Sequence, residues 1–211
     1  SLYKISKKLG QFDIFFSFRS SFRSKFLKLL ISSKKKFQFD RNRYQNRHQV
    51  EKYNDFINEN LHTHFHSGRL IIHPSLKQTN KNSKPILGIN PGASYGDSKR
   101  WHPEKFAKVA TELSHKFDIL IFGSVDEKNI ATDIEKLLIE NNVSNYQNLA
   151  AQTSVEELIY HISTLDIFVT GDSGPMHIAA AFQVPTVAIF GPTKDTETSQ
   201  WMNDKSTIVK K

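Results

Sequence analysis

The stretch that decides the fold is residues 170–182, TGDSGPMHIAAAF. It follows an apolar run at 166–169 and leads into small apolar residues, which is typical of a strand, a turn and a helix. Pro175 suits the first helical turn, because its φ is fixed near the helical value and its missing N–H is not needed there. Gly171 and Gly174 let a ligand approach the backbone closely, and the free amides and dipole of a helix start favour an anion. Taken alone, the stretch fits an ordinary capped helix better, since Asp and Ser are common caps.

The composition is that of a globular protein without thiol chemistry. The chain has 211 residues, of which 38% are hydrophobic and 24% are charged, and it contains no cysteine. Disulfides, catalytic thiols and cysteine-based zinc sites are therefore excluded. No apolar run approaches the ~20 residues that a transmembrane helix needs, and the first residues do not form a signal peptide. We therefore expect a cytoplasmic protein.

The net charge of +8 conceals two parts of opposite sign. Residues 1–84 carry 18 Lys and Arg against 5 Asp and Glu, a net charge of +13, whereas residues 85–211 carry 11 against 16, a net charge of −5. The first part should face an anionic partner such as membrane lipid, nucleic acid or an acidic substrate. The alternative is that the excess lysine only keeps the chain soluble.

Residues 1–78 are predicted to be part of an α/β domain. The run 12–18 is prone to form a strand, and residues 22–30 form a basic amphipathic helix. Such a helix suits a membrane surface, but a helix packed on a sheet has the same pattern. A short strand at 36–40 and a helix at 48–60 follow. The apolar face of the basic helix consists of Phe22, Phe26, Leu29 and Leu30.

The end of this part contains alternating histidines and a polar linker. On a strand, His62, His64 and His66 would share one face, which is the pattern of a metal site. No carboxylate or cysteine lies between them, so we do not expect them to bind a metal. Residues 79–84 are predicted to be the linker to a second domain at 85–211.

From Pro85 onward, strands and helices alternate over short loops. This alternation predicts a parallel, doubly wound sheet, which binds ligands at the carboxyl ends of its strands. The predicted strands are 86–90, 118–122, 146–149, 166–170, 186–190 and 206–209. The predicted helices are 103–116, 126–141, 154–163 and the one that begins at Pro175.

Three strand-to-helix turns of this sheet carry residues suited to a nucleotide with a diphosphate. The turn at 90–101 offers small residues, a serine and the cations Lys99 and Arg100, although such a pair is equally common as a solvated surface pair. Glu127 in the second turn is suited to ribose hydroxyls, but an acid at a helix start is an equally good explanation. The third turn is the opening stretch. The expected ligand-binding residues are Gly92, Ala93, Ser94, Lys99, Glu127, Asp172, Ser173, Gly174, Pro175 and His177.

The sequence contains no D-x-D, the pair of acids with which many sugar-nucleotide enzymes hold a metal on the diphosphate. Lys99 and the helix start at Pro175 would then neutralise the leaving group. We therefore expect a reaction that uses neither a metal nor a cofactor.

In their order and spacing, these motifs resemble the ADP-heptose:lipopolysaccharide heptosyltransferases of glycosyltransferase family 9. The segments that carry the resemblance are 91–94, PGAS, with 99–101, KRW, then 171–177, GDSGPMH, and 190–193, FGPT. The SGPMH form is closer to the heptosyltransferase II type. The resemblance covers about residues 85–200, and residues 1–84 match only loosely.

The resemblance implies a GT-B architecture with two Rossmann-like domains and the active site between them. The C-terminal domain, mostly present here, would hold the donor, and heptose would be transferred with inversion to the lipopolysaccharide inner core. Lys99 and Ser94 would contact the donor phosphates, and Glu127 the ribose. The residues that would line the diphosphate and the sugar are Asp172, Ser173, Gly174 and His177.

One part of the family's pattern is not matched. Its proposed general base is an Asp in the first Gly-rich turn of the N-terminal domain, whereas Asp13 lies inside an apolar run. We therefore expect the base to lie upstream of Ser1, the N-terminal domain to be partial, and the C-terminal domain to be truncated at its end. We expect such a fragment to bind nucleotide weakly and not to catalyse the transfer reaction.

The resemblance also implies the partners. The donor would be ADP-heptose, the acceptor lipid A–core, and the basic segment 19–36 would face the acceptor or the inner membrane. Its candidate contacts are Arg19, Arg23, Lys25 and Lys28, which are chosen by their chemistry and not by a motif.

Two other functions remain open at this point. The first is a different GT-B enzyme with another sugar nucleotide, either an envelope glycosyltransferase or an epimerase. The second is a nucleic-acid-binding protein built on the basic part. The aromatic residues there are Phe in apolar runs rather than rings interleaved with Gly and basic residues, so we expect no nucleic-acid partner.

Overall fold

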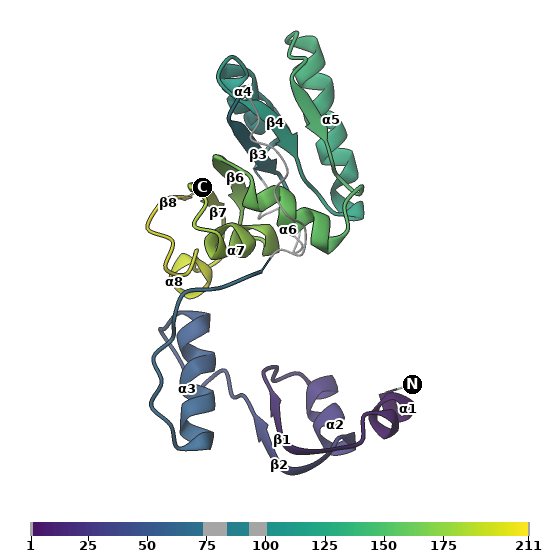
Figure 1. Cartoon of the computed structure of the whole chain (residues 1–211), viewed down its shortest axis with the longest axis vertical. Coiled ribbons are helices and arrows are strands. Elements are labelled where there is room, and N and C mark those ends of the chain that lie inside the picture. The colour runs from purple at the N-terminus through teal and green to yellow at the C-terminus, as the bar shows by residue number, and fades with distance from the viewer. Residues whose placement is uncertain (1, 74–83, 93–100, 211) are drawn as a thin grey trace. The chain divides into compact units, whose positions relative to one another are not determined.

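The computed structural model describes residues 2–73, 84–92 and 101–210 (Figure 1). The chain divides into two compact units, residues 1–68 and residues 69–211. The segment 79–83, which belongs to the expected linker, lies outside the described residues. Each unit is an α/β structure and is considered by itself below.

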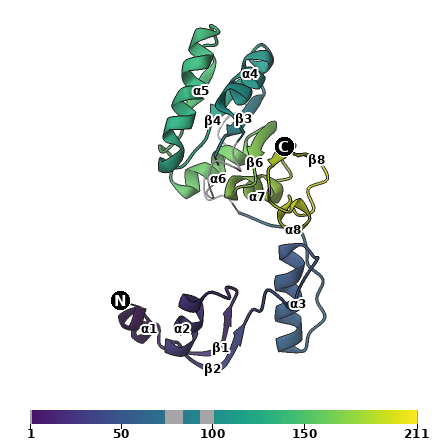
Figure 2. The ribbon, with the colours of Figure 1, turned by 180° about the vertical axis from the view of Figure 1, so that it is seen from behind.

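The first unit contains a two-stranded parallel sheet and three helices (Figure 2). Strands β1 (Gln11–Ser17) and β2 (Ser32–Gln38) pair in parallel, with Phe16 opposite Phe37. Helix α2 (Phe22–Leu30) connects them, as the βαβ pattern requires. Helix α1 (Leu2–Lys8) precedes β1, and α3 (Gln49–Leu61) follows β2.

An aromatic cluster forms the core of this unit. Phe39, Tyr44 and Phe56 are buried, and Phe56 packs edge to face on Phe16, with ring centroids 5.5 Å apart. His48 caps α3 through its Nδ1 atom, which accepts the N–H of Val50 at 3.2 Å. The predicted strand and helix that supply this cluster are therefore confirmed.

Helix α2 buries little of its apolar face. Ser21 caps it by accepting the N–H of Ser24, and none of its residues is buried. Phe22 and Leu29 are 87% and 73% exposed, whereas Leu27 and Leu30 are half-buried. The helix is confirmed, but most of the apolar face expected from the sequence is turned away from its neighbours.

Two details of this part differ from the sequence-based expectation. Strand β2 begins at Ser32, four residues before the predicted strand, because its Ser- and Lys-rich start pairs with the start of β1. His62 is the left-handed C-cap of α3, with φ of 55°, and the chain that follows it to residue 73 has no regular structure. His62, His64 and His66 therefore do not share a strand face, and no metal-binding cluster occurs among the described residues.

The second unit is a doubly wound sheet of six parallel strands in the order β5-β4-β3-β6-β7-β8. This arrangement confirms the predicted sheet. The strands are β3 (Ile86–Asn90), β4 (Asp118–Ile121), β5 (Tyr146–Asn148), β6 (Ile167–Gly171), β7 (Thr186–Phe190) and β8 (Ser206–Lys210). The helices are α4 (Pro103–Leu113), α5 (Lys128–Glu140) after the short helix η2 (Val125–Glu127), α6 (Val155–Ser163), α7 (Gly174–Ala181) and α8 (Asp195–Thr198).

Helices lie on both faces of this sheet (Figure 1), and each face carries its own hydrophobic core. Leu87 and Ile89 point to the face covered by α4 and α5, whereas Ile86 points to the face covered by α6 and α7. Side chains along a strand alternate in this way, so β3 is buried on both sides. Position 88 of this strand requires glycine, because a Cβ there would stand 2.4 Å from the Leu165 side chain.

Helix starts in this unit follow the predicted signals. Ser154 accepts the N–H of Glu157 at 3.2 Å, and the Glu157 carboxylate accepts the N–H of Ser154 at 2.7 Å. Pro103 and Pro175 occupy first turns, as expected from their missing N–H groups. Helices α1 and α8 were not predicted from the sequence. Among the described residues, none of the helices is long and apolar enough to span a bilayer.

Candidate functional site

The order of strands in the second unit creates one switch point, between β3 and β6. From β3 the chain adds β4 and β5 on one side, and from β6 it adds β7 and β8 on the other. The helices after β3 and β6 therefore leave to opposite faces, and open α/β sheets bind ligands at the carboxyl ends of strands at such a point. The turns after β3, β4 and β6, which the sequence singled out, follow three adjacent strands. The expected common edge is confirmed.

A buried polar cluster joins the ends of β3 and β6. Asn90, the last residue of β3, is only 2% exposed. Its side-chain amide donates to Thr170 Oγ1 and to Ser173 Oγ, both at 3.3 Å, and lies 3.5 Å from the carbonyl oxygen of Gly92. Thr170 Oγ1 and Ser173 Oγ are themselves 3.0 Å apart. Buried polar groups need such partners, so this cluster holds the β6–α7 turn against the β3 turn.

The turn after β4 packs against the turn after β3 through a carboxylate and a glycine. Glu127 is 8% exposed, and its Oε2 accepts the N–H of Ser124 at 2.7 Å. A Cβ at Gly92 would stand 1.9 Å from Glu127 Cδ, so only glycine leaves room for this carboxylate. Glu127 therefore caps η2 and also lies beside the β3 turn. The helix-start explanation of this acid is confirmed, and its ribose contact stays a prediction.

The start of α7 is not capped by the side chain of its N-cap residue. Ser173 is the N-cap in an extended conformation, and its hydroxyl makes no capping hydrogen bond within the described chain. It contacts Thr170 and Asn90 instead. A Cβ built at Gly174 meets no described atom within 4 Å, so neither packing nor a positive φ explains this glycine. A helix start that its own N-cap side chain does not cap, with a glycine in the first turn, is a common place for an anion to bind.

The structure brings together the described members of the predicted site. Gly92 lies in the turn after β3, Glu127 lies in the turn after β4, and Ser173 is the N-cap of α7. Asp172 and His177 are half-buried on either side of the start of α7. The predicted residues that lie outside the described residues are Ala93, Ser94, Lys99 and Arg100.

Sequence reasoning missed Asn90 and Thr170 as members of this site. Asn90 is the last residue of the apolar strand β3, and Thr170 is the last residue but one of β6, so a polar residue near the end of each apolar strand was a signal that was available. Their contact depends on β3 and β6 being neighbours, although the two residues are 80 positions apart in the chain.

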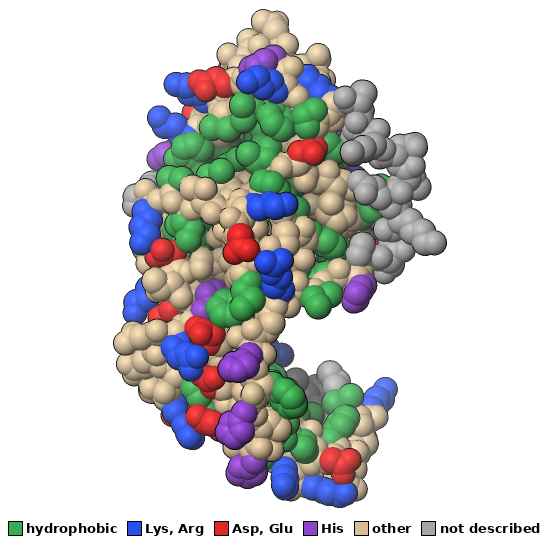
Figure 3. Space-filling model, turned by 60° about the vertical axis from the view of Figure 1, so that its left-hand side comes forward, with side chains coloured by type: hydrophobic (Ala, Val, Ile, Leu, Met, Phe, Trp, Pro, Cys, Tyr) green, Lys and Arg blue, Asp and Glu red, His purple; other side chains and the backbone are tan. Residues whose placement is uncertain are grey.

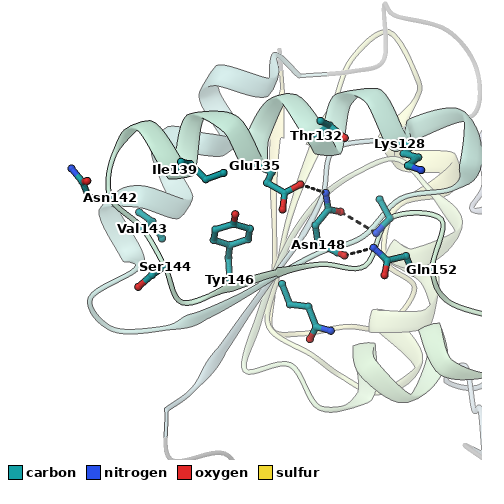
Figure 4. Close-up of a pocket in the computed structure, with 12 residues that line it drawn as sticks. Lys128, Thr132, Glu135, Ile139, Asn142, Val143, Ser144, Tyr146, Asn148 and Gln152 are labelled. Carbon is teal, nitrogen blue, oxygen red and sulfur yellow. Dashed lines mark hydrogen bonds between the residues drawn. The ribbon is translucent and has the colours of Figure 1, made fainter.

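A separate cavity of about 830 Å³ lies between α5 and β5, at one edge of the sheet (Figure 4). Asn148 donates to the Glu135 carboxylate at 2.9 Å, and its own Oδ1 accepts the N–H of Ala150 at 3.1 Å. Burial, and then the nearby Glu135, raises the pKa of Tyr146. These contacts fix the turn after β5 and do not reach the switch point between β3 and β6.

Comparison with known families and curated proteins gives one consistent result. The model of glycosyltransferase family 9 (heptosyltransferase) matches residues 2–211. Lipooligosaccharide heptosyltransferase 2 of Campylobacter jejuni serotype O:2 is 43% identical over 210 residues, which are 97% of this chain and 66% of that protein. The Haemophilus influenzae protein of the same name is 37% identical over 128 residues, covering 60% of this chain and 37% of that protein. The chain thus spans just under two thirds of its Campylobacter relative.

Solved structures agree at the level of the fold. A glycosyltransferase family 9 structure from Veillonella parvula superposes with a TM-score of 0.82 at 18% identity, covering 100% of this chain and 66% of that one. The ADP-heptose lipopolysaccharide heptosyltransferase II of E. coli superposes with a TM-score of 0.75 at 22% identity, covering 99% of this chain and 70% of that one. These likenesses show the fold of this chain, in agreement with the expected partial GT-B architecture.

Proposed function

The chain belongs to glycosyltransferase family 9 (heptosyltransferase), and from this premise we propose that it binds ADP-heptose and serves the transfer of heptose to the lipopolysaccharide inner core. The observation that carries the proposal is the start of α7 at the switch point, which the Ser173 hydroxyl does not cap and which the Asn90 cluster joins to the turn after β3, where Glu127 packs against Gly92. The second unit would hold the donor, and lipid A–core would be the acceptor. The E. coli heptosyltransferase WaaC, a solved structure to which this chain is similar in fold, has been determined with ADP, the nucleotide part of this donor.

The α7 start would stabilise the leaving group. In an inverting transfer, an acceptor hydroxyl attacks the anomeric carbon, the bond from that carbon to the diphosphate oxygen breaks, and ADP leaves with the electron pair. Amides at a helix start and the helix dipole favour that negative charge, typically by about 0.3–1 kcal/mol for the dipole alone. Lys99 would add a cation by its place in the motif, and the base that takes the acceptor proton would lie in the N-terminal domain.

Glu127 would recognise the ribose. One of its oxygens already accepts the N–H of Ser124, so the carboxylate is held in one orientation. A carboxylate that is held in this way can accept hydrogen bonds from vicinal hydroxyls without first losing side-chain entropy. The buried packing against Gly92 supports this role, because it places the acid beside the turn that precedes the predicted phosphate contacts.

The test is the stabilisation of the chain by nucleotides. A ligand at 100 times its Kd stabilises the native state by about 2.7 kcal/mol, which is roughly 5–10 °C in Tm for a domain of this size. We expect this shift with ADP and ADP-heptose in the presence of EDTA, and a smaller one with UDP-sugars. A shift with UDP-sugars alone would favour a different GT-B enzyme, and a requirement for Mg²⁺ or Mn²⁺ would contradict metal independence.

We also propose that helix α2 makes a peripheral contact with an anionic membrane. Its exposed Phe22 and Leu29 lie among basic residues, including the exposed Arg23 and Lys25. In the lower right of Figure 3, basic and hydrophobic side chains of the first unit lie next to one another. Each Lys or Arg near an anionic surface contributes about 1 kcal/mol, and inserted apolar side chains add to it.

Sedimentation with lipid vesicles tests this contact. The chain should bind vesicles that contain 30% phosphatidylglycerol and should not bind pure phosphatidylcholine vesicles. The double variant Phe22→Ser with Leu29→Ser should lose the binding. The control is Phe65→Ser, since Phe65 is also 73% exposed but lies outside α2. Equal binding by the double variant would refute a role of α2.

A further inference from the structure

We propose that Asn90 is a positioning residue that makes the Ser173 hydroxyl a hydrogen-bond donor toward the diphosphate. This inference rests on the proposed function, since it assumes an anion at the start of α7. Asn90 itself is 2% exposed at the end of β3, so it acts through Ser173 and not by direct contact with the ligand.

The direction of the hydrogen bonds follows from what each group can do. The amide nitrogen of Asn90 only donates, and it donates to Thr170 Oγ1 and Ser173 Oγ, both at 3.3 Å. The carbonyl oxygen of Gly92 at 3.5 Å cannot donate, so it faces the amide nitrogen and not the amide oxygen. This neighbour fixes the orientation of the Asn90 amide.

The remaining hydrogens are assigned in the same way. Thr170 donates its only hydroxyl hydrogen to the carbonyl oxygen of Gly171 at 3.1 Å. In the 3.0 Å contact between Thr170 Oγ1 and Ser173 Oγ, the donor is therefore Ser173. Ser173 thus accepts from Asn90 and has a hydrogen to give. A rotation about the Cβ–Oγ bond of Ser173 turns its hydroxyl hydrogen away from Thr170 Oγ1, so that it can donate to an anion at the α7 start.

An aspartate at position 90 would reverse this arrangement without changing its shape. An ionised carboxylate only accepts, so it would take the hydrogens of Ser173 and Thr170 and leave Ser173 with lone pairs toward the diphosphate. A hydrogen bond from a neutral donor to a charged group is among the stronger ones, so its loss should weaken ADP binding roughly tenfold to hundredfold. Burial at this position and the charge of the bound diphosphate would both raise the pKa of the carboxyl above its ordinary value, so protonation on the way to pH 5 restores one donor and should recover part of the affinity.

The experiment measures ADP binding by calorimetry for the whole chain and for Asn90→Asp from pH 8 to pH 5. The readout is the ratio of the two Kd values at each pH, because titration of the ADP phosphates affects both proteins equally. We expect a ratio of at least about ten at pH 8 that shrinks as the pH falls, which a purely structural role would not produce. The matched control is Asn203→Asp: Asn203 is also buried and donates to the carbonyl of Val184 at 2.9 Å, before the start of β7.

A second variant keeps the inference testable if Asn90→Asp unfolds. Ser173→Ala removes the hydroxyl through which Asn90 acts, so Asn90→Ala should weaken ADP binding in the native background and not in the Ser173→Ala background. If Asn90→Asp binds ADP with the same Kd as the wild-type chain at every pH, this inference alone is overturned. An equal loss in Asn203→Asp would assign the effect to stability and would also overturn it. No ADP binding by the wild-type chain would overturn both this inference and the proposed function.

Discussion

Replacing Gly92 by alanine tests whether the first two turns of the site are locked together. The added Cβ would stand 1.9 Å from Glu127 Cδ and Oε1 and 2.4 Å from Oε2, whereas carbon atoms in contact stand about 3.5–4.0 Å apart. The carboxylate must therefore leave its place and give up the N–H of Ser124, a capping bond worth about 1 kcal/mol. Forcing the side chain into a packed surrounding adds about 1–3 kcal/mol. We expect the free energy of unfolding to fall by about 2–4 kcal/mol in total.

Urea denaturation of a double-mutant cycle isolates this contact. Glu127→Ala should cost about 1 kcal/mol through the lost cap, and it also removes the atoms that the new Cβ would meet. Gly92→Ala should then cost less than about 0.5 kcal/mol in the Glu127→Ala background, so the coupling between the two sites should be at least about 1.5 kcal/mol. The reasoning is refuted if Gly92→Ala costs the same in both backgrounds.

Three further predictions use other parts of the structure. Gly174→Ala should leave the urea midpoint within experimental error, because its Cβ meets no described atom. The same methyl group should weaken ADP binding about tenfold because it fills the approach to the backbone, and equal Kd values for the two proteins would contradict this. Burial lowers the pKa of His161 below 6.5 in the native state, so the unfolded chain binds more protons below that pH, and the free energy of unfolding falls as the pH drops from 7.5 to 5.5. The dependence of the free energy of unfolding on pH should be shallower in His161→Gln, and an unchanged dependence would exclude His161 as its source. Burial and the hydrogen bond to Glu59 at 2.6 Å raise the pKa of Tyr44 to about 12. The contribution of Tyr44 to the free energy of unfolding is therefore complete below pH 10 and is lost as the pH rises through 12. An ultraviolet titration should show one phenol that ionises with this pKa, and this transition should be absent in Tyr44→Phe.

Much of the second unit could be predicted because its signals are local. Apolar runs of strand length alternate with helical segments, and Pro175 and Ser154 mark helix starts by chemistry that acts within one turn. Parallel strands bring their carboxyl ends to one edge, so the turns that hold Gly92 and Glu127 could be assigned to one site.

The parts that could not be predicted depend on tertiary neighbours. Periodicity does not reveal that β3 lies next to β6, and without that order the contact of Asn90 with Thr170 cannot be inferred. The Lys-rich start of β2 becomes a strand by pairing with β1, against its own weak β propensity. Likewise, the hydrophobic pattern of α2 predicts a helix but does not predict how much of its apolar face is covered. The exposure of Phe22 could therefore not be predicted from the sequence.

The exposed position of Asp13 agrees with its exclusion as a catalytic base. It lies on β1 and forms an ion pair with Lys34 at 2.7 Å, and both side chains are mostly exposed. Surface pairs of this kind contribute about 0–1 kcal/mol.

The central claim is that a nucleoside diphosphate binds at the carboxyl ends of β3, β4 and β6. The most direct measurement is a titration of the ¹⁵N-labelled chain with ADP, followed by amide chemical shifts. The account predicts that the largest shifts occur at Gly92, Glu127, Gly174 and His177. Shifts confined to the cavity between α5 and β5, around Tyr146, would contradict it, as would a spectrum that ADP leaves unchanged.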